Sequence, residues 1–341
     1  MFYKLVQKAL FATDPETAHE LTLEALKLGH WSGATRLLCK EKNQPVQCMG
    51  LEFPNPVGVA PGLDKNADCF EALGDLGFGF VEVGTVTPRP QPGNAKPRVF
   101  RLTESQAMIN RLGFNNKGVD YLVKKVKNHR FKGVLGINIG KNFDTPLENA
   151  ADDYLHCLDK VYPYADYVTV NISSPNTRNL RDLQEEDQLD ALLGALSRRR
   201  EELADQYDRC APMALKVSPD LESGAIRTIA DIVSRHGIDA VIATNTTVDR
   251  DRVAGMKHAD EMGGLSGAPL KEKADRILAE LRRALPAEID MIGVGGITCG
   301  QDAVDKLKRG ASLVQFYTGM VYRGPALITE CLQAIAAYRK G

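Results

Sequence analysis

The sequence predicts an α/β protein, a (β/α)8 TIM barrel that carries a small helical extension at its N-terminus. Eight short apolar segments rich in β-branched residues recur along the 341 residues, and amphipathic segments lie between them. Near-continuous apolar runs are typical of strands buried on both faces of a parallel sheet, and their alternation with helices is typical of a barrel. An open doubly wound sheet is the alternative, but no G-x-G-x-x-G fingerprint follows the first strand.

The strands are expected where these apolar segments end in Gly, Asn, Ser or Thr. In chain order they occupy residues 56–62, 78–86, 134–140, 166–173, 212–218, 239–245, 290–296 and 311–318. Helices are expected between them, for example over 148–162 and 188–203. Two segments exceed a minimal barrel, 87–115 after the second strand and 247–270 after the sixth. Both follow the carboxyl ends of strands, where barrels build their active sites, so we expect functional loops.

The first forty residues predict two helices outside the barrel. FYKLVQKALF forms the first, and Thr13-Asp14-Pro15-Glu16 has the capping side chain, early proline and acidic first turn that start a second. That helix is expected to run to about Leu28 and to stop at Gly29. Apolar residues form one-sided faces, namely Leu5, Val6, Ala9, Leu10, Ala18, Leu21, Ala25 and Leu28. The two helices are either a cap docked on the barrel or a platform resting in a membrane interface.

We therefore divide the chain into the extension, residues 1–40, and the barrel, residues 41–341. Hydrophobic residues make up 43% and charged residues 26%, which is ordinary for a soluble globular protein. The net charge of −1 creates no field for nucleic acid, so we expect no nucleic-acid partner. Seven cysteines without a C-x-x-C pair indicate thiols in a reducing compartment. No apolar run reaches about 18 residues, and the N-terminus lacks the pattern of a signal peptide.

The residues just past the predicted strands are rich in amides, hydroxyls and lysines. They are Gly62, Asp64, Lys65, Thr85, Asn138, Asn171, Ser173, Ser174, Asn176, Lys216, Thr244, Asn245, Thr246, Gly295, Gly296, Tyr317 and Thr318. Converging amides present donors and acceptors to a flat ligand with several C=O and N–H groups, and lysines supply positive charge for electrons or a carboxylate. None of the six histidines falls at a strand end, and no G-x-S-x-G appears, so neither a metal site nor a hydrolase triad is expected.

The segment GVGGIT, residues 293–298, predicts a phosphate site. Its paired glycines follow the seventh strand and precede a helix that we expect Thr298 to cap. Backbone N–H groups at such a turn cradle phosphate, and barrels commonly bind phosphate after strands seven and eight. A tight turn without a ligand is the alternative interpretation. A phosphate beside an amide-rich centre favours a mononucleotide-like cofactor lying across the mouth of the barrel.

These strand-end residues closely resemble the class 2 dihydroorotate dehydrogenases. The matching motifs are GLDKNAD (62–68), NRLGFNN (110–116), NISSPNT (171–177), ALKVSPD (214–220), TNTT (244–247), GGLSG (263–267), GVGGI (293–297) and QFYTG (315–319). The resemblance covers nearly the whole chain, including the N-terminal helices. It implies an FMN-containing barrel that oxidises dihydroorotate to orotate in pyrimidine synthesis, with a membrane quinone that reoxidises the flavin. Class 1 members use a cysteine base and lack the extension, whereas this chain has a serine and the extension.

The resemblance also implies a role for individual residues, with Ser174 as the general base. The substrate would be held by Lys65, Asn110, Arg111, Leu112, Gly113, Phe114, Asn171, Asn176, Asn245 and Thr246. FMN would be held by Pro61, Gly62, Leu63, Asp64, Lys65, Thr85, Asn138, Asn171, Lys216, Thr244, Gly267, Gly296, Tyr317 and Thr318. We expect a monomer bound peripherally to the cytoplasmic face of the cell membrane, with the two helices as the apolar entrance for the quinone. The alternatives are a non-catalytic barrel that binds a phosphate ligand and a class 1-like enzyme with another acceptor.

Overall fold

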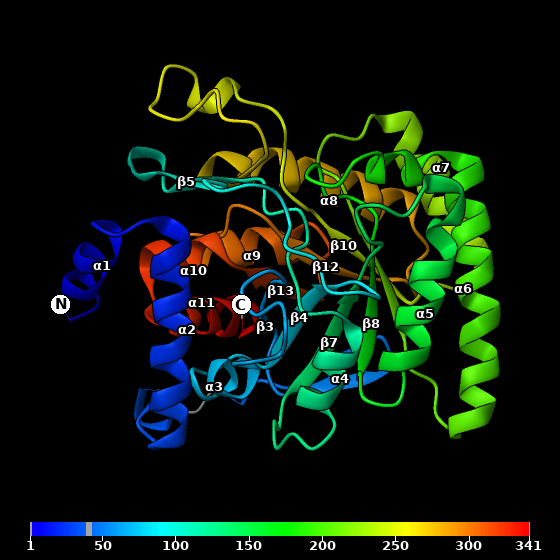
Figure 1. Cartoon of the computed structure of the whole chain (residues 1–341), viewed down its shortest axis with the longest axis horizontal. Helices are drawn as coiled ribbons and strands as arrows, with labels where there is room; N and C mark the ends of the chain where they lie inside the picture. The colour runs from blue at the N-terminus through cyan, green and yellow to red at the C-terminus, as the bar shows by residue number, and fades with distance from the viewer. Residues whose placement is uncertain (1, 39–42, 341) are drawn as a thin grey trace.

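The computed structural model describes residues 2–38 and 43–340. Within these ranges, eight parallel strands close into a barrel in the order β10-β12-β13-β3-β4-β7-β8-β9 (Figure 1). Their bounds are β3 Val57–Val59, β4 Phe80–Val86, β7 Val134–Ile139, β8 Tyr167–Asn171, β9 Met213–Val217, β10 Ala240–Ala243, β12 Asp290–Val294 and β13 Leu313–Phe316. Each strand lies inside one of the predicted segments, so the predicted barrel is confirmed.

Helices surround the barrel and bury their apolar faces on its strands (Figure 1). They are α3 Phe70–Asp75, α4 Val119–Val126, α5 Ala150–Val161, α6 Glu186–Tyr207, α7 Ser223–Arg235, α8 Lys271–Ala284, α9 Gly300–Lys308, α10 Thr318–Arg323 and α11 Ala326–Lys340. The helices predicted over 148–162 and 188–203 correspond to α5 and α6. Thr298 is not the cap of α9, because the helix begins one residue later and Cys299 takes that position. The Thr298 hydroxyl instead donates to Asp302 Oδ2 at 3.0 Å.

A short hairpin closes the end of the barrel where the strands begin. It consists of β1 Val46–Cys48 and β2 Leu51–Phe53, which pair antiparallel. Phe53 is fully buried and meets Phe80 of β4 edge to face, with ring centroids 5.2 Å apart. The Met49 amide donates to Asp290 Oδ2 at 2.6 Å, which ties the hairpin turn to the start of β12. The opposite end of the barrel therefore remains for the site.

The two long insertions combine into one antiparallel sheet. The first insertion supplies β5 Val99–Leu102 and β6 Ala107–Asn110, and the second supplies β11 Gly264–Gly267. Strand β6 lies in the middle and pairs with both neighbours, so Asn110 stands opposite Val99 and Gly264. The sequence predicted two separate loops, and their pairing is a feature of the tertiary structure alone.

The N-terminal extension contains the two predicted helices, α1 Phe2–Phe11 and α2 Pro15–Trp31. Asp14 caps α2, since its carboxylate accepts the amides of Glu16 and Thr17, each at 3.0 Å. Gly29 does not end the helix, which continues to Trp31 and turns at Gly33 with a φ of 77°. A Cβ on Gly29 would lie 2.9 Å from Thr35 Cγ2, so glycine serves close packing there rather than a stop.

The extension is docked on α3, on the insertion sheet and, through α1, on α10 (Figure 1). Tyr3 of α1 donates to Val321 O of α10 at 2.7 Å. Glu16 of α2 pairs with Arg98 beside β5 at 2.7 Å, and both side chains are buried. In the described part of the chain, no helix is both long enough and apolar enough to cross a membrane. The Leu5 side chain and the expected boundary at residues 40 and 41 lie outside what the structure describes.

The outer face of α2 remains apolar and uncovered. Leu21, Leu28 and Trp31 are 55%, 68% and 87% exposed. The packing of the helix pair agrees with the docked cap, and the membrane platform, the other alternative from the sequence, stays a prediction. One face packs on the barrel, and the other is available for contact with an apolar surface.

Candidate functional site

A hollow of about 1140 Å³ opens at the carboxyl ends of the barrel strands. Most residues that the sequence assigned to the site line it. They are Pro61, Gly62, Lys65, Thr85, Asn110, Leu112, Gly113, Phe114, Asn171, Ser174, Asn176, Lys216, Thr244, Asn245, Thr246, Gly267, Gly296, Tyr317 and Thr318. Because the strands are parallel, their carboxyl ends meet on one side, which brings these distant residues together.

Leu63, Asp64, Asn138 and Arg111, which were also assigned to the site, are not among the lining residues. Leu63 belongs to the hydrophobic core. Asp64 is buried and accepts the amides of Asp68 and Cys69 at 2.9 and 2.6 Å, so it shapes the loop rather than the cavity. Arg111 donates to Glu261 at 2.7 Å, away from the cavity lining, and thereby links the two insertions. The side chains of these residues support the walls from behind.

Other lining residues were missed by the sequence analysis. They are Ala60, Val99, Met108, Ser266, Leu270, Val294, Ile297, Phe316 and Gly319. Val99, Met108 and Ser266 come from the insertion sheet, whose long-range pairing left no local signal. Val294 and Phe316 are the last residues of β12 and β13, which end two residues before the predicted segments do, so the prediction placed the mouth slightly too late in the chain.

Amides from several strands form one hydrogen-bonded layer across the mouth. Asn171 Nδ2 donates to Thr85 Oγ1 at 2.9 Å and to Asn138 Oδ1 at 3.1 Å. Asn245 Nδ2 donates to Ser173 Oγ at 3.0 Å and to Asn171 Oδ1 at 3.3 Å. Asn138 lies at the back of this layer and fixes the amides in front of it. The layer is preorganised before any ligand arrives.

The insertion sheet adds a further asparagine above this layer. Asn110 ends β6, and its Oδ1 accepts Asn176 Nδ2 at 3.2 Å. Asn176 Oδ1 is buried and has no partner among the described residues. Buried polar atoms in proteins are nearly always hydrogen-bonded, so this oxygen marks a place for a ligand donor.

Ser174 lies three residues beyond the end of β8 and is 6% exposed. Its Oγ accepts the Asn176 amide at 3.2 Å. An N–H donor favours an oxygen that carries negative charge, so it stabilises the charge that develops on Oγ as the hydroxyl gives up its own proton. No histidine occurs among the cavity-lining residues of the described chain. Any proton taken by Ser174 must therefore leave by another group.

Two lysines in the cavity have no anionic partner. Among the described residues, neither Lys65 Nζ nor Lys216 Nζ lies within salt-bridge distance of a carboxylate. Burial lowers the pKa of Lys65 to about 8, and burial also lowers the pKa of Lys216. Lys216 belongs to β9 and is 5% exposed. One buried and one half-buried lysine without a salt bridge predict anionic or electron-rich ligands in this cavity.

We expect the affinity for an anionic ligand beside Lys65 to fall as the pH rises through 8. A bound carboxylate raises the lysine pKa, so binding is strongest where the free protein already carries the proton. Above pH 8 the affinity should fall by about tenfold per pH unit. Titration of the flavin spectrum with orotate between pH 6.5 and 9.5 measures this affinity. Lys65→Met should remove this slope, and an equal slope in that variant would assign it to another group.

Glycines at the mouth provide a cradle for phosphate. Gly267 and Gly296 have φ angles of 97° and 77°, in the region that favours glycine. A Cβ on Gly296 would lie 2.4 Å from Lys271 Cα, and one on Gly267 would lie 2.2 Å from Gln106 O. Thr318 Oγ1, beside them, donates to Ser266 Oγ at 2.8 Å. Backbone segments therefore approach one another closely here, and the cavity lining includes the hydroxyls of Ser266 and Thr318, which suit a phosphate.

The fold and the site together define a barrel enzyme for a flat, phosphate-bearing cofactor. The amide layer, the unpaired Lys216 and the glycine cradle fit a flavin mononucleotide in donor chemistry. A family model described as dihydroorotate dehydrogenase matches residues 44–338.

Curated relatives named dihydroorotate dehydrogenase (quinone) include one from Azoarcus sp. (strain BH72). It is 57% identical to this chain over 339 residues, which make up 99% of this chain and 99% of the relative. One from Thiobacillus denitrificans is 56% identical over 98% of this chain and 100% of its own length. A crystal structure of DHODH from Eimeria tenella in complex with ferulenol has a TM-score of 0.87 and 36% identity, covering 96% of this chain and 92% of that chain. The chain therefore belongs to the dihydroorotate dehydrogenase family of flavin-dependent oxidoreductases.

Proposed function

We propose that this chain oxidises dihydroorotate to orotate in pyrimidine synthesis and passes the electrons to a quinone, with FMN as its flavin. The quinone-linked relatives match this chain over its whole length, including the helical extension. The observation that carries the proposal is the cavity in which Lys65, Lys216, Ser174 and the asparagine layer meet. The same cavity ends in the glycine cradle, which suits the phosphate of FMN.

The cofactor would lie along strands β3, β4, β9 and β12 at the mouth. We assign to it the Pro61–Lys65 backbone and the side of the cavity formed by Thr85, Lys216, Thr244, Gly267, Gly296, Tyr317 and Thr318. Asn138 acts on it through Thr85 and Asn171, which it holds by hydrogen bonds. When bound, FMN supplies an acceptor for a hydride and for the pair of electrons that the hydride carries.

The substrate would bind against the amides. Dihydroorotate has a ring with C=O and N–H groups and one carboxylate, which match asparagine amides and the Lys65 ammonium. We assign to it Lys65, Asn171, Asn176, Asn245 and Thr246, together with the cavity-lining part of the Asn110–Phe114 segment. The unpaired Asn176 Oδ1 provides an acceptor for a ring N–H.

Oxidation removes a proton from one ring carbon and a hydride from its neighbour, and a carbon–carbon double bond forms between them. Ser174 Oγ accepts the proton while its own hydroxyl proton passes to water, so no net charge stays on the serine, and the two electrons leave with the hydride. The Asn176 amide stabilises the charge at Oγ. Walls from the insertion sheet surround the reacting carbons and limit their contact with water.

The extension provides the route for the quinone. His19 of α2 lies beside Tyr317, with ring centroids 6.3 Å apart, and Tyr317 lines the cofactor cavity. Arg101 stacks over Phe11, 4.7 Å from the ring centroid, and its buried Nε has no partner among the described residues. Burial lowers the pKa of His19 to about 3, so its imidazole is neutral. We infer that an apolar molecule with a polar carbonyl end reaches Tyr317 from the α2 side, past His19 and Arg101.

We place the protein as a monomer at the cytoplasmic face of the cell membrane, bound peripherally through α1 and α2. The exposed side chains Leu21, Leu28 and Trp31 support this placement. Partial insertion of such an apolar face into the interfacial region holds a protein without a spanning helix.

The test of the function is the colour of the purified protein. It should be yellow, bleach with dihydroorotate in the absence of oxygen, and recover its colour when a quinone is added. A protein that binds FMN but does not bleach would be the non-catalytic barrel. If the colour recovers with fumarate or NAD but not with quinone, the protein is a class 1-like enzyme with another electron acceptor.

The apolar face of α2 gives a separate prediction. Leu28→Glu combined with Trp31→Glu should lower binding to phospholipid vesicles and turnover with a long-chain quinone by at least about tenfold, because two exposed apolar side chains no longer enter the interface. Flavin reduction by dihydroorotate should be unchanged. Tyr207→Glu on α6, which is on the other side of the barrel, is the control and should change neither (Figure 1). Unaltered vesicle binding in the double variant would contradict the platform.

A further inference from the structure

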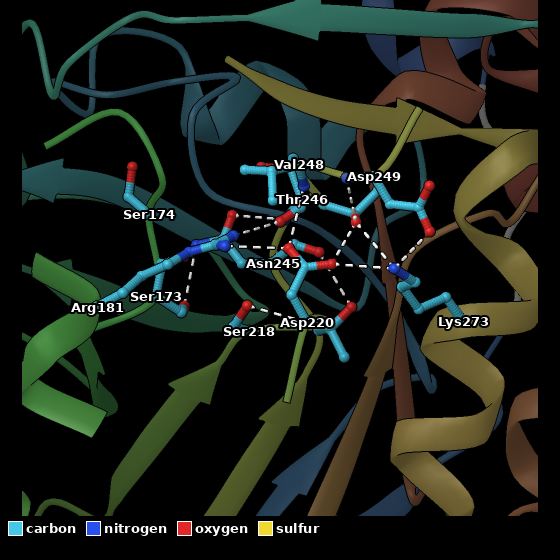
Figure 2. Close-up of polar contacts among 12 residues, drawn as sticks. Ser173, Ser174, Arg181, Ser218, Asp220, Asn245, Thr246, Val248, Asp249 and Lys273 are labelled. Atoms are coloured by element: carbon cyan, nitrogen blue, oxygen red, sulfur yellow. Dashed lines mark hydrogen bonds and ion pairs between the residues drawn. The ribbon is translucent and has the colours of Figure 1, made fainter. Parts of the chain in front are cut away.

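A charged cluster lies behind the loop that carries Ser174 and outside the cavity lining (Figure 2). It consists of Arg181, Asp220, Lys273 and Asp249, and we call it the ionic clasp. Arg181 lies in the 3-10 turn Leu180–Gln184, Asp220 follows β9, Asp249 lies in the second insertion, and Lys273 belongs to α8. The chemistry assigned above makes no use of these residues.

Arg181 connects three loops with one side chain. Its Nε donates to Ser173 O at 3.2 Å, and its Nη2 donates to Thr246 O at 2.9 Å. Its Nη1 pairs with Asp220 Oδ2 at 3.0 Å. The loops after β8, β9 and β10 are thus held by the planar fork of a single guanidinium, whose five N–H donors have a fixed geometry.

Asp220 fixes the guanidinium from behind. Its carboxylate also accepts the Val248 amide at 3.0 Å and Lys273 Nζ at 3.2 Å, and it bonds the Thr247 hydroxyl. Burial acts to raise the pKa of Asp220, but these hydrogen bonds and the Arg181 charge hold it below its usual value. The carboxylate therefore stays ionised, and Lys273 is balanced in turn by Asp249 at 2.6 Å.

The residues on either side of the clasp are those that would hold and deprotonate the substrate. Ser173 precedes the proposed base, and its hydroxyl accepts Asn245 Nδ2 at 3.0 Å. Thr246 follows Asn245, and its amide donates to Asn245 Oδ1 at 2.9 Å. Figure 2 shows the Ser174 hydroxyl directed away from the Arg181 guanidinium, so Arg181 acts through the backbone and does not touch the reacting atoms.

We propose that Arg181, held by Asp220, is a positioning residue that sets the distance between Ser174 and the substrate held by Asn245 and Thr246. Fixing the Ser173 carbonyl orients the Ser173–Ser174 peptide, and fixing the Thr246 carbonyl orients the opposite loop. One rigid group determines both orientations, so a change in it displaces the base relative to its proton. The inference rests on the proposed role of Ser174 as the base.

Arg181→Gln should lower the rate of anaerobic flavin reduction at saturating dihydroorotate by about 10–100-fold, since a displacement of about 1 Å costs up to about 10²-fold. FMN content and its visible spectrum should be retained, because Arg181 lies outside the cofactor cavity. Arg181→Lys should restore little of the rate, because a point charge cannot serve three acceptors. Full recovery with lysine would mean that charge, rather than position, is what matters.

The isotope effect separates positioning from general damage to the fold. Dihydroorotate deuterated at the carbon that loses its proton should show a larger kinetic isotope effect with Arg181→Gln than with the unaltered protein, because transfer to a displaced base limits the rate more strongly. Addition of Asp220→Asn to Arg181→Gln should cause little further loss, since both changes break the same connection.

Arg200→Gln is the matched control. Arg200 pairs with Asp239 at 2.6 Å and donates to Gly237 O at 2.9 Å, but at the beginning of β10, the end of the barrel away from the cavity. The Arg200→Gln variant loses an ion pair and a carbonyl contact of the same kind as Arg181→Gln does. Its rate of flavin reduction and its isotope effect should remain unchanged. Equal losses in Arg181→Gln and Arg200→Gln would overturn the proposal.

An unchanged reduction rate in Arg181→Gln, or a slower rate with an unchanged isotope effect, would also overturn it. The failure of the proposed base is distinguishable. If Ser174→Ala leaves the rate of flavin reduction unchanged, Ser174 is not the base, and the inference about Arg181 loses its basis. If Ser174→Ala is slow while Arg181→Gln is normal, only the inference fails.

Discussion

Replacement of Ser174 with alanine is expected to slow anaerobic reduction of the flavin by dihydroorotate by about 10²–10⁴-fold, the range that general base catalysis supplies. The hydroxyl lines the cavity and accepts the Asn176 amide, so its loss removes the proton acceptor while changing little volume. The flavin should stay bound, because its assigned contacts lie elsewhere in the cavity. Stopped-flow absorbance under anaerobic conditions measures the rate directly.

Ser173→Ala is the control for this variant. The neighbouring hydroxyl is fully buried and is engaged with Asn245 and Asn171 rather than directed into the cavity. Its loss leaves Asn245 Nδ2 with one acceptor fewer and should slow reduction by less than Ser174→Ala. Equal rates in the two variants, or a normal rate in Ser174→Ala, would remove Ser174 from the mechanism.

Replacement of Lys216 with methionine should lower the midpoint potential of the bound flavin and slow its reduction by about 10–100-fold. The lysine is the buried cation assigned to the cofactor, and an interaction with a charged group contributes about 1.5–3 kcal/mol. Reduction places negative charge on the flavin, so the loss of that cation weakens the reduced state more than the oxidised state. For a two-electron couple this corresponds to roughly 30–60 mV. Spectroelectrochemical titration measures the shift.

Lys141→Met provides the comparison. Lys141 is as deeply buried as Lys216, but its Nζ donates to Thr145 O at 2.8 Å and to Asn142 O at 3.3 Å, outside the cavity. Its loss leaves carbonyl oxygens without donors, so the melting temperature should fall while the flavin potential stays constant. Lys216→Met should retain its fold, because methionine fills the space and introduces no buried charge. A potential that is unchanged in Lys216→Met would refute the cofactor role of this lysine.

The barrel was predictable because its strands carry the signal in their own residues. Strand β8 and strand β9 are buried along their whole length, and the sequence shows them as near-continuous apolar runs. The hairpin β1–β2 and the insertion strands escaped prediction, because each is three or four residues long and partly exposed, whereas the equally short β3 is buried throughout. Segments so short do not establish a period, and their pairing depends on partners far away in the chain.

The helix boundaries show a similar limit. Gly29 was interpreted as a stop, but its missing side chain makes room for Thr35, and the helix continues beyond it. A glycine selected for close packing looks the same in a sequence as a glycine selected for a left-handed turn. Gly33, four residues later, has the positive φ that the prediction sought.

The candidate site was predictable wherever a strand end determines it. Asn171 ends β8 and stands opposite Lys216, the last but one residue of β9, and both line the cavity. Asn138 was predicted by the same rule, yet it lies behind Thr85, since a position at a strand end does not determine which layer of the mouth a side chain occupies. The ionic clasp was not found at all, because a charged residue in a loop has no periodic signal.

The sequence by itself determined the barrel, the set of residues gathered at its mouth and the resemblance to a family. The tertiary structure alone decided how the two insertions pair, as in the bond between Arg111 and Glu261, 150 positions apart. It also decided that Arg181 joins the loops after β8, β9 and β10. The physical reason is that apolar periodicity records whether a residue is buried, whereas a hydrogen bond between distant loops exists only after the barrel has closed and placed them a few ångströms apart.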